Sequence, residues 1–312
     1  MAAGSLKVFA LSAVAVTVSC GYHRRLGCCT LWQHTLIHRS RRVFDRSGLD
    51  SGFPYRSLAD GLVHGARPLF FLDYFGTGKL EPDVAEQVVA GLSESCKAAG
   101  CVLIGGETAE MPGLYSSGEY DLAGSIVGLV DRDRLVTGEG IQDGDILIGL
   151  ASEGLHTNGY ALAQRVLIDK AAVDLADTVT GSFVTFEEAL LARHRNYATA
   201  VLPILGSKPG LIAGMAHITG GGLIENIPRI LPPGLGARIE TDSWTPLPIF
   251  KAIQNLGAIE PGEMYRVFNM GIGFVLVCAA SQSDELSDQL RAGGEKPIAI
   301  GTIVRGTGVT LI

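Results

Sequence analysis

Glycine-rich corners that follow short apolar runs constrain the fold of this chain more than any other feature of its sequence. The 312 residues include 41 glycines, which are spread among apolar runs rather than gathered into repeats. This spacing suits a protein in which many strands turn tightly into helices. We therefore expect an α/β fold of the α+β type.

The first corner reads Gly-Gly-Glu-Thr-Ala-Glu-Met-Pro-Gly over residues 105–113 and directly follows the apolar run Cys101 to Ile104. Gly105 and Gly106 let the backbone approach a ligand closely. Glu107, Thr108 and Glu110 supply oxygens of the kind that hold Mg²⁺ beside a phosphate chain. A charged, glycine-rich turn is the alternative, and it is the better interpretation of a bare Gly-Gly pair.

A second corner, Thr219-Gly220-Gly221-Gly222, lies between an apolar run and an amphipathic helix pattern. Backbone amides at the start of a helix favour a bound phosphate, so we predict a phosphate site here. A plain strand-to-helix turn is the alternative, although such a turn does not need three glycines in a row. His217, two residues earlier, taken by itself is interpreted as a satisfied core histidine.

The third corner, His156-Thr157-Asn158-Gly159, again follows a predicted strand and precedes a predicted helix. Thr157 or Asn158 can cap that helix, and capping alone explains the asparagine. Imidazole is the side chain best suited to proton transfer near neutral pH, so His156 is a candidate for substrate binding or acid-base assistance.

These corners and several further motifs resemble, residue for residue, the phosphoribosylformylglycinamidine cyclo-ligase family, also called aminoimidazole ribonucleotide synthetase. The resemblance begins near Asp60 and continues to the C-terminus. Besides residues 105–113 and 156–160, the matching segments are Leu69 to Tyr74, Thr77 to Leu80, His217 to Gly222 and Met264 to Gly273.

The chain departs from the family pattern upstream of Asp60 and at one internal site. Asp60 matches the aspartate of a family Asn-Asp pair, but Ala59 stands where the asparagine is expected. A glycine loop that helps hold ATP in the family is missing. Arg193-His194 replaces the usual Pro-Thr ahead of a tyrosine that matches Tyr197.

The resemblance implies an ATP-dependent ring closure of formylglycinamidine ribonucleotide to aminoimidazole ribonucleotide in purine biosynthesis. It also implies a homodimer of two-domain chains, with the active site between domains and across the dimer. The alternatives are a non-catalytic fragment or pseudoenzyme that keeps the fold, and related ATP users such as selenophosphate synthetase or thiamine-monophosphate kinase.

The site residues that follow fall into four groups. His156 is the predicted catalytic residue, and Asp60 and Glu107 are the predicted Mg²⁺ ligands. The predicted ATP-binding residues are Asp60, Gly105, Gly106, Glu107, Thr108 and Glu110. The predicted substrate-binding residues are Asn158, Thr219, Gly220, Gly221 and Gly222, with the substrate's 5′-phosphate as the anion that the resemblance suggests.

Composition and charge exclude some classes of protein. With 47% hydrophobic and 18% charged residues, the chain can bury a large core, and its length favours two domains. Its net charge is −7, although residues 1–44 contain no acidic residue. An acidic body argues against a nucleic-acid partner.

The six cysteines show no zinc-binding spacing, so we expect reduced thiols in a cytosolic protein without a membrane partner.

The N-terminal 44 residues match nothing in the family. Val8 to Val18 is an apolar run of the length of a signal-peptide core, and the basic stretch after it equally suits a mitochondrial presequence. A translated non-coding or frame-shifted region is the third interpretation. We expect residues 1–44 to be a presequence or an artefact, 45–135 to be a truncated ATP-binding and dimerisation domain, and 136–312 to be a mixed-sheet substrate domain.

The apolar patterns predict the elements of both domains. In the first we expect a β-α-β-β remnant and then a linker over residues 131–144. In the second we expect strands at 146–151, 212–217, 237–240, 272–279, 298–304 and 309–312, and helices at 158–170, 187–205, 223–231, 247–256 and 284–290.

Overall fold

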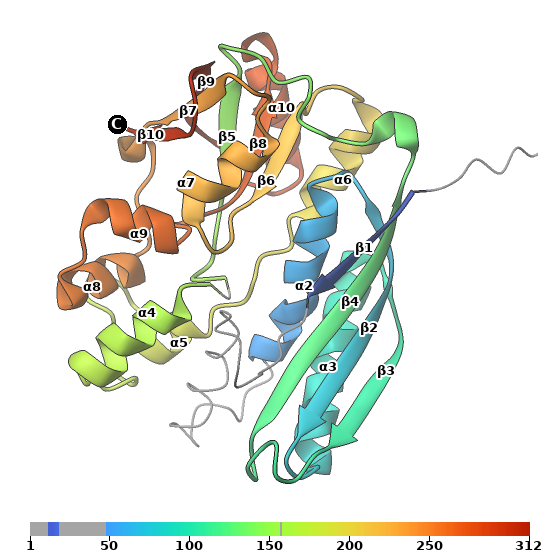
Figure 1. The fold of residues 1–312 in the computed structure, drawn as a ribbon, viewed down its shortest axis with the longest axis vertical. Helices are drawn as coiled ribbons and strands as arrows, with labels where there is room; N and C mark the ends of the chain where they lie inside the picture. The colour runs from blue at the N-terminus through green and yellow to red at the C-terminus, as the bar shows by residue number, and fades with distance from the viewer. Residues whose placement is uncertain (1–11, 19–47, 157) are drawn as a thin grey trace, which may run out of the picture.

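The computed structural model describes residues 12–18, 48–156 and 158–312. In this part of the chain two mixed layers of sheet and helix lie side by side (Figure 1). One sheet has four strands in the order β1-β4-β2-β3, and the other has six in the order β10-β7-β9-β5-β8-β6. The predicted α/β class is confirmed.

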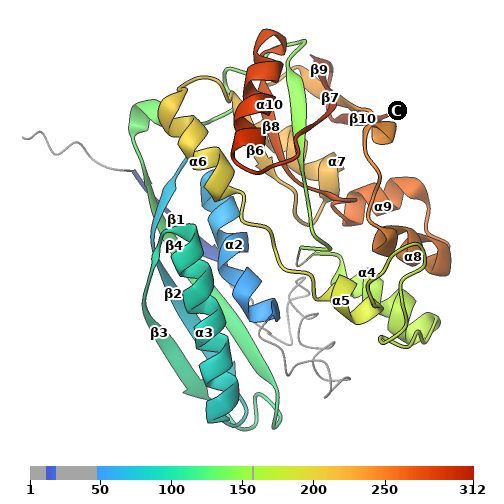
Figure 2. The same cartoon turned by 180° about the vertical axis from the view of Figure 1, so that it is seen from behind.

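The first sheet carries its helices on one face. Its strands are β1 (Ser12–Val18), β2 (Arg67–Thr77), β3 (Val102–Glu110) and β4 (Tyr120–Val130). β2 pairs parallel with β3 and antiparallel with β4. Helices α2 (Gly48–Leu62) and α3 (Pro82–Ala99) cover one face, and no helix of the described residues covers the other (Figures 1 and 2). α3 begins with Pro82 in its first turn and ends at Gly100 in a left-handed conformation, as helix termini favour.

The second sheet is almost wholly antiparallel. Its strands are β5 (Ile146–Ala151), β6 (Gly214–His217), β7 (Leu235–Ile239), β8 (Ile272–Cys278), β9 (Ile298–Arg305) and β10 (Val309–Leu311). All seven residues of β8 are buried, which explains why it reads as an unbroken apolar run. Only β10 and β7 pair in parallel among these strands.

The helices of the second half are short. They are α4 (Tyr160–Gln164), continued by a π-helical turn over Arg165–Lys170, α5 (Phe186–Leu190), α6 (Ala198–Ser207), α7 (Gly222–Asn226), continued by a 3-10 turn over Ile227–Ile230, α8 (Pro248–Gly257), α9 (Pro261–Val267) and α10 (Ser283–Ala292). Short 3-10 turns also cover Arg132–Arg134, Thr241–Ser243 and Ala280–Gln282.

One hydrophobic core joins the two sheets. Phe71 and Phe75 of β2 pack in the same cluster as Leu62 of α2, Val201 of α6 and Phe274 of β8. α2 and α6 therefore lie between the sheets (Figure 2). Apolar burial of this kind is the main force that fixes the two halves against each other.

The single helix predicted over residues 187–205 is wrong. A capping box at Thr185 starts α5, which ends at Leu190, and α6 starts only at Ala198. The chain between them is not helical, and His194 and Tyr197 within it are 3% and 1% exposed. Tertiary burial of these rings outweighs the helical propensity of the segment.

The N-terminal half also differs from expectation. The predicted β-α-β-β remnant omits β1 and α2, and α9 was not predicted in the second half. The strand predicted over Cys101 to Ile104 continues to Glu110, so the first six residues of the glycine-rich nonapeptide are strand rather than corner. The predictions for residues 1–44 lie outside the described residues except at β1. Among the described residues, no helix has the length and apolar character that a membrane span requires.

Candidate active site

Three buried histidines meet where β5 and β6 end beside the start of β8. Leu150 of β5 and His217 of β6 both lie opposite Phe274 of β8. His156 follows β5, His217 ends β6, and His194 comes from the non-helical segment between α5 and α6. Their exposed fractions are 1%, 6% and 3%, so water does not serve as their main hydrogen-bond partner.

Asp60, His217 and His194 form a continuous hydrogen-bonded row. Asp60 Oδ1 lies 2.8 Å from His217 Nδ1, and His217 Nε2 lies 2.9 Å from His194 Nε2. His194 Nδ1 lies 3.0 Å from the carbonyl oxygen of Arg195. The row links α2 of the first half to β6 of the second half.

His156 stacks on this row without joining it. Its ring stacks on that of His194, with centroids 4.2 Å apart and an angle of 25° between the ring planes. Its Nε2 accepts hydrogen bonds from the backbone N–H groups of Glu153 (3.1 Å) and Arg195 (3.3 Å). Burial, helped by the nearby His217 and Arg195, lowers the pKa of His156 to about 3. His156 is therefore a neutral ring at neutral pH, with its proton on Nδ1.

Tyr197 and Gly273 complete the packing around the histidines. The Tyr197 hydroxyl donates a hydrogen bond of 2.9 Å to the carbonyl of Ala151. A Cβ atom on Gly273 would overlap that hydroxyl and would lie 2.9 Å from the ring of His156. Gly273 is thus required for side-chain packing.

The predicted substrate-binding residues come together next to this cluster. The only atom near a Cβ built on Gly220 is Asn158 Oδ1, at 3.7 Å, so the two corners face each other. Gly220 is exposed and Asn158 is half-buried, which leaves the space between them open to a ligand. Asn158 Nδ2 donates to the carbonyl of His156 (2.9 Å), so the asparagine also fixes its own corner.

Gly221 and Gly222 have structural reasons to be glycine. Both have positive φ angles, and a Cβ on Gly222 would overlap the carbonyl of Tyr265. The buried Asn226, which the sequence analysis missed, holds this corner by donating to the carbonyls of Thr219, Gly220 and Gly222. Only Gly220 of the three glycines is free of a packing requirement.

Asn269 is a second residue that the sequence analysis did not single out. Its Oδ1 accepts from the Ser152 hydroxyl (2.9 Å) and from the Gly271 amide (2.8 Å), and its Nδ2 donates to the carbonyl of Gly154 (2.9 Å). It thereby ties the entry to β8 to the segment that leads to His156.

The residues of the first corner lie elsewhere in the molecule. Glu107 and Thr108 are exposed on β3, opposite Tyr74 and Phe75 of β2. β3 is the edge strand of the first sheet, and it lies on the side away from the second sheet (Figures 1 and 2). Within one chain, this corner does not meet the histidine cluster.

Two residues of the first corner have local roles. Glu110 accepts a hydrogen bond from the Leu80 amide at 2.8 Å, which secures the turn before α3. A Cβ on Gly106 would overlap Asp73 of the neighbouring strand, whereas Gly105 faces open space. Gly105, Glu107 and Thr108 are therefore the residues that remain available to a ligand.

The two predicted Mg²⁺ ligands are not brought together in one chain. The Asp60 carboxylate is bonded to His217 on the inner side of the sheet, and Glu107 lies on the outer edge. Within the described part of the chain, no three acidic, histidine or cysteine side chains are placed to hold one metal ion.

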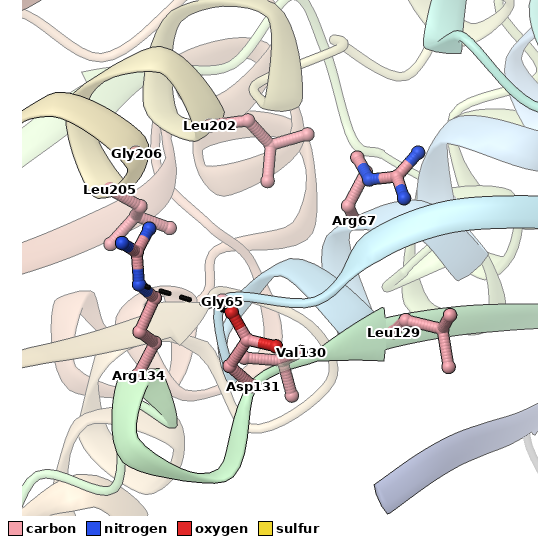
Figure 3. A pocket seen from close by; sticks show the side chains of 9 residues that line it. All are labelled: Gly65, Arg67, Leu129, Val130, Asp131, Arg134, Leu202, Leu205 and Gly206. Carbon is pink, nitrogen blue, oxygen red and sulfur yellow. Dashed lines mark ion pairs between the residues drawn. The ribbon is translucent and has the colours of Figure 1, made fainter. Parts of the chain in front are cut away.

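A cavity of about 300 Å³ lies between the turn after α2, the end of β4 and α6 (Figure 3). Arg67 and Arg134 line it together with Leu129, Leu202 and Leu205. Arg134 pairs at 4.0 Å with Asp131 at the rim. None of the predicted site residues lines this cavity.

Comparison with known protein families gives matches over most of the chain. The family described as AIR synthase related protein, C-terminal domain, matches residues 142–312, and the corresponding N-terminal domain matches residues 55–130. A phosphoribosylformylglycinamidine cyclo-ligase of Bacillus mycoides is 50% identical over 254 residues, 81% of this chain and 72% of that protein. A protein of the same name from Trichlorobacter lovleyi is 50% identical over 244 residues, 78% and 69% of the two chains.

Solved structures share the fold at lower identity. A thiamine-monophosphate kinase from Stenotrophomonas maltophilia has a TM-score of 0.64 at 19% identity, covering 97% of this chain and 85% of that chain. Hydrogenase maturation protein HypE in complex with ATP has a TM-score of 0.64 at 17% identity, covering 89% of this chain and 90% of that chain.

Proposed function

The chain belongs to the phosphoribosylformylglycinamidine cyclo-ligase family, and from this membership we propose that it closes the imidazole ring of aminoimidazole ribonucleotide in purine biosynthesis. It is a ligase that uses ATP. The observation that carries the proposal is the meeting of the Asn158 and Gly220 corners, because it brings two separate family motifs to one place in the fold.

The chemistry requires activation of an inert oxygen. An amide-type oxygen is a poor leaving group, and transfer of the γ-phosphoryl group of ATP to the formyl oxygen of formylglycinamidine ribonucleotide makes it a good one. A nitrogen of the same substrate then attacks the activated carbon, the ring closes, and phosphate leaves. The protein contributes by holding the two substrates in line and by stabilising developing negative charge.

We assign the nucleotide substrate to the second half of the chain. The backbone amides of Thr219, Gly220 and Gly221 are the proposed donors for its 5′-phosphate, since the amide of Gly222 already donates to the carbonyl of Thr219 at 3.0 Å. The Asn158 amide group, at the facing corner, orients the remainder of the nucleotide. Of the two roles predicted for His156, substrate binding fits better than proton transfer. Its low pKa makes it a weak base at neutral pH, and its Nε2 already accepts two backbone hydrogen bonds.

We assign ATP to the first corner on β3. The exposed oxygens of Glu107 and Thr108 suit a hard cation such as Mg²⁺, which neutralises charge on the phosphate chain when it is bound. Glu107 is the carboxylate that fits this role. Asp60 does not fit it, because its carboxylate is bonded to His217.

A homodimer reconciles the separation of the two corners, because β3 of a partner chain can face the histidine cluster that its own chain leaves distant. The uncovered face of the first sheet supports this proposal. Leu72, Val102 and Ile104 are 39%, 61% and 60% exposed there, and exposed apolar side chains gathered on one sheet face are typical of interfaces. The free, buried cysteines Cys96, Cys101 and Cys278 are compatible with a cytoplasmic enzyme.

The test is phosphate release from ATP by the purified full chain with formylglycinamidine ribonucleotide, followed together with imidazole product by mass spectrometry. We expect product and phosphate in equal amounts. Asn158→Ala should raise KM for the nucleotide about tenfold, the value of one lost hydrogen bond. The exposed Asn255→Ala serves as the matched control and should leave KM unchanged. ATP hydrolysis at a rate that does not depend on formylglycinamidine ribonucleotide would contradict the proposal. So would the absence of product at saturating concentrations of both substrates.

A further inference from the structure

The row of Asp60, His217 and His194 contains three hydrogen bonds, and each one needs a proton. The carbonyl of Arg195 can only accept, so His194 Nδ1 carries a proton. A second proton lies between Asp60 and His217 Nδ1, and the 2.9 Å separation of the two Nε2 atoms requires a third. Two neutral imidazoles beside a carboxylate supply only two protons. The row therefore holds one extra proton, and the carboxylate balances its charge.

We propose that His194 is a positioning residue for the facing residues Asn158 and Gly220, which we call the substrate corner. It holds His217 against Asp60 through this shared proton, and it holds His156 through its stacked ring. This inference rests on the proposed function for its kinetic consequence.

The surroundings of His194 place the shared proton on its neighbour. His194 faces His156, His217 and Arg195 in the second half, and Arg56 of α2 from the first. Burial, with the nearby His156 and His217, lowers the pKa of His194 well below its usual value. The charge of Arg195 is taken up by Glu295 at 3.1 Å and Glu153 at 3.5 Å. His217, next to the carboxylate, is thus the doubly protonated ring, and His194 accepts from it.

His156 connects the His194 ring to the substrate corner. The backbone N–H of Arg195, directly after His194, donates to His156 Nε2, and the carbonyl of His156 accepts from Asn158. Loss of the His194 ring removes both the stack and the anchor of this backbone segment. The position of Asn158 opposite Gly220 then becomes less defined.

Two variants separate the functions of the ring. His194→Phe keeps a ring to stack on His156 but has no nitrogen, and His194→Gln keeps an oxygen that can accept from His217 and an amide that can donate to Arg195. Nitrogen-15 NMR of histidine-labelled full chain reads the ring states directly. In the wild type we expect His217 to be doubly protonated and His194 to carry its proton on Nδ1 alone. His194→Gln should preserve the state of His217, and His194→Phe should abolish it.

Kinetics give the second readout. We expect His194→Phe to raise KM for formylglycinamidine ribonucleotide about tenfold, as for one lost hydrogen bond, with kcat and KM for ATP little changed. His194→Gln should restore most of the affinity. If wild-type His217 carries a single proton, or if both variants lower kcat alike without changing KM, His194 has no positioning role. Should even the wild type fail to turn over, the proposed function falls, and the NMR result still decides the arrangement of the row.

Discussion

At the scale of single residues, Gly273 shows how closely the histidine cluster is packed. An added Cβ would overlap the Tyr197 hydroxyl and crowd the His156 ring, and neither can move freely because both are buried. Gly273→Ala should therefore lower the free energy of unfolding by about 1 to 3 kcal/mol, the usual cost of overpacking. Urea denaturation measures this. Gly206→Ala in α6, where nothing lies within 4 Å, is the control and should be neutral or slightly stabilising.

His156 also makes stability depend on pH. Burial lowers its pKa from 6.5 to about 3, so between these values the unfolded chain binds a proton that the folded chain does not. The contribution of neutral His156 to the free energy of unfolding is complete above pH 6.5 and is lost as the pH falls toward 3. Over this range the free energy of unfolding changes by about 1.4 kcal/mol per pH unit. His156→Asn, which tolerates the positive φ of 53°, should remove this slope from pH-dependent denaturation curves. The exposed His64→Asn should keep it, and identical slopes in both variants would refute the assignment.

At the scale of elements, the sequence predicted most strands and helices because each has a local apolar pattern. β5, β8 and α10 lie within a few residues of their predicted bounds. The segment between α5 and α6 was predicted as helix because the contacts that unwind it are distant in sequence, such as the pairing of His194 with His217, 23 residues away. The turns at residues 156–159 and 219–222 were predicted because glycine marks them. Asn226 and Asn269 were missed because a buried asparagine leaves no pattern in its neighbours.

A substitution of Asn269 tests how the segment after β5 is held against the entry to β8. It joins Ser152 and Gly154 to the entry of β8 across more than one hundred residues of sequence. Asn269→Ala leaves the buried carbonyl of Gly154 and the amide of Gly271 without their partner, so we expect a loss of about 2 to 4 kcal/mol in thermal or urea unfolding. Since these loops lead to His156, KM for the nucleotide should rise as well. Asn255→Ala on α8 again provides the comparison, and equal stability of the two variants would rule out this role.

At the scale of the whole molecule, the first sheet is the incomplete element. Helices α2 and α3 cover one face, and Leu72, Val102 and Ile104 are exposed on the opposite face, over which no helix of the described residues lies (Figure 1). The corner to which we assign ATP lies on β3 of the same sheet, so in the proposed dimer the first sheet closes against a second copy and completes the active site in one step. The sequence placed residues 105–110 in a turn, whereas they are strand, because the strand continues past the apolar run that marked it.

Ile104→Glu tests this event. A carboxylate at the centre of a sheet-to-sheet interface has no partner there, so the dimer dissociation constant should rise at least about 100-fold, roughly 2.7 kcal/mol. Analytical ultracentrifugation over a range of protein concentrations measures it. ATP turnover should fall with the fraction of dimer, because in the proposed dimer each site takes its Glu107 from the other copy. Leu256→Glu, at an exposed apolar position of α8, controls for added charge and should leave assembly unchanged. A wild-type chain that sediments as a monomer at high concentration while turning over ATP would show that one chain suffices, and the two corners would then have to meet by a movement between the sheets.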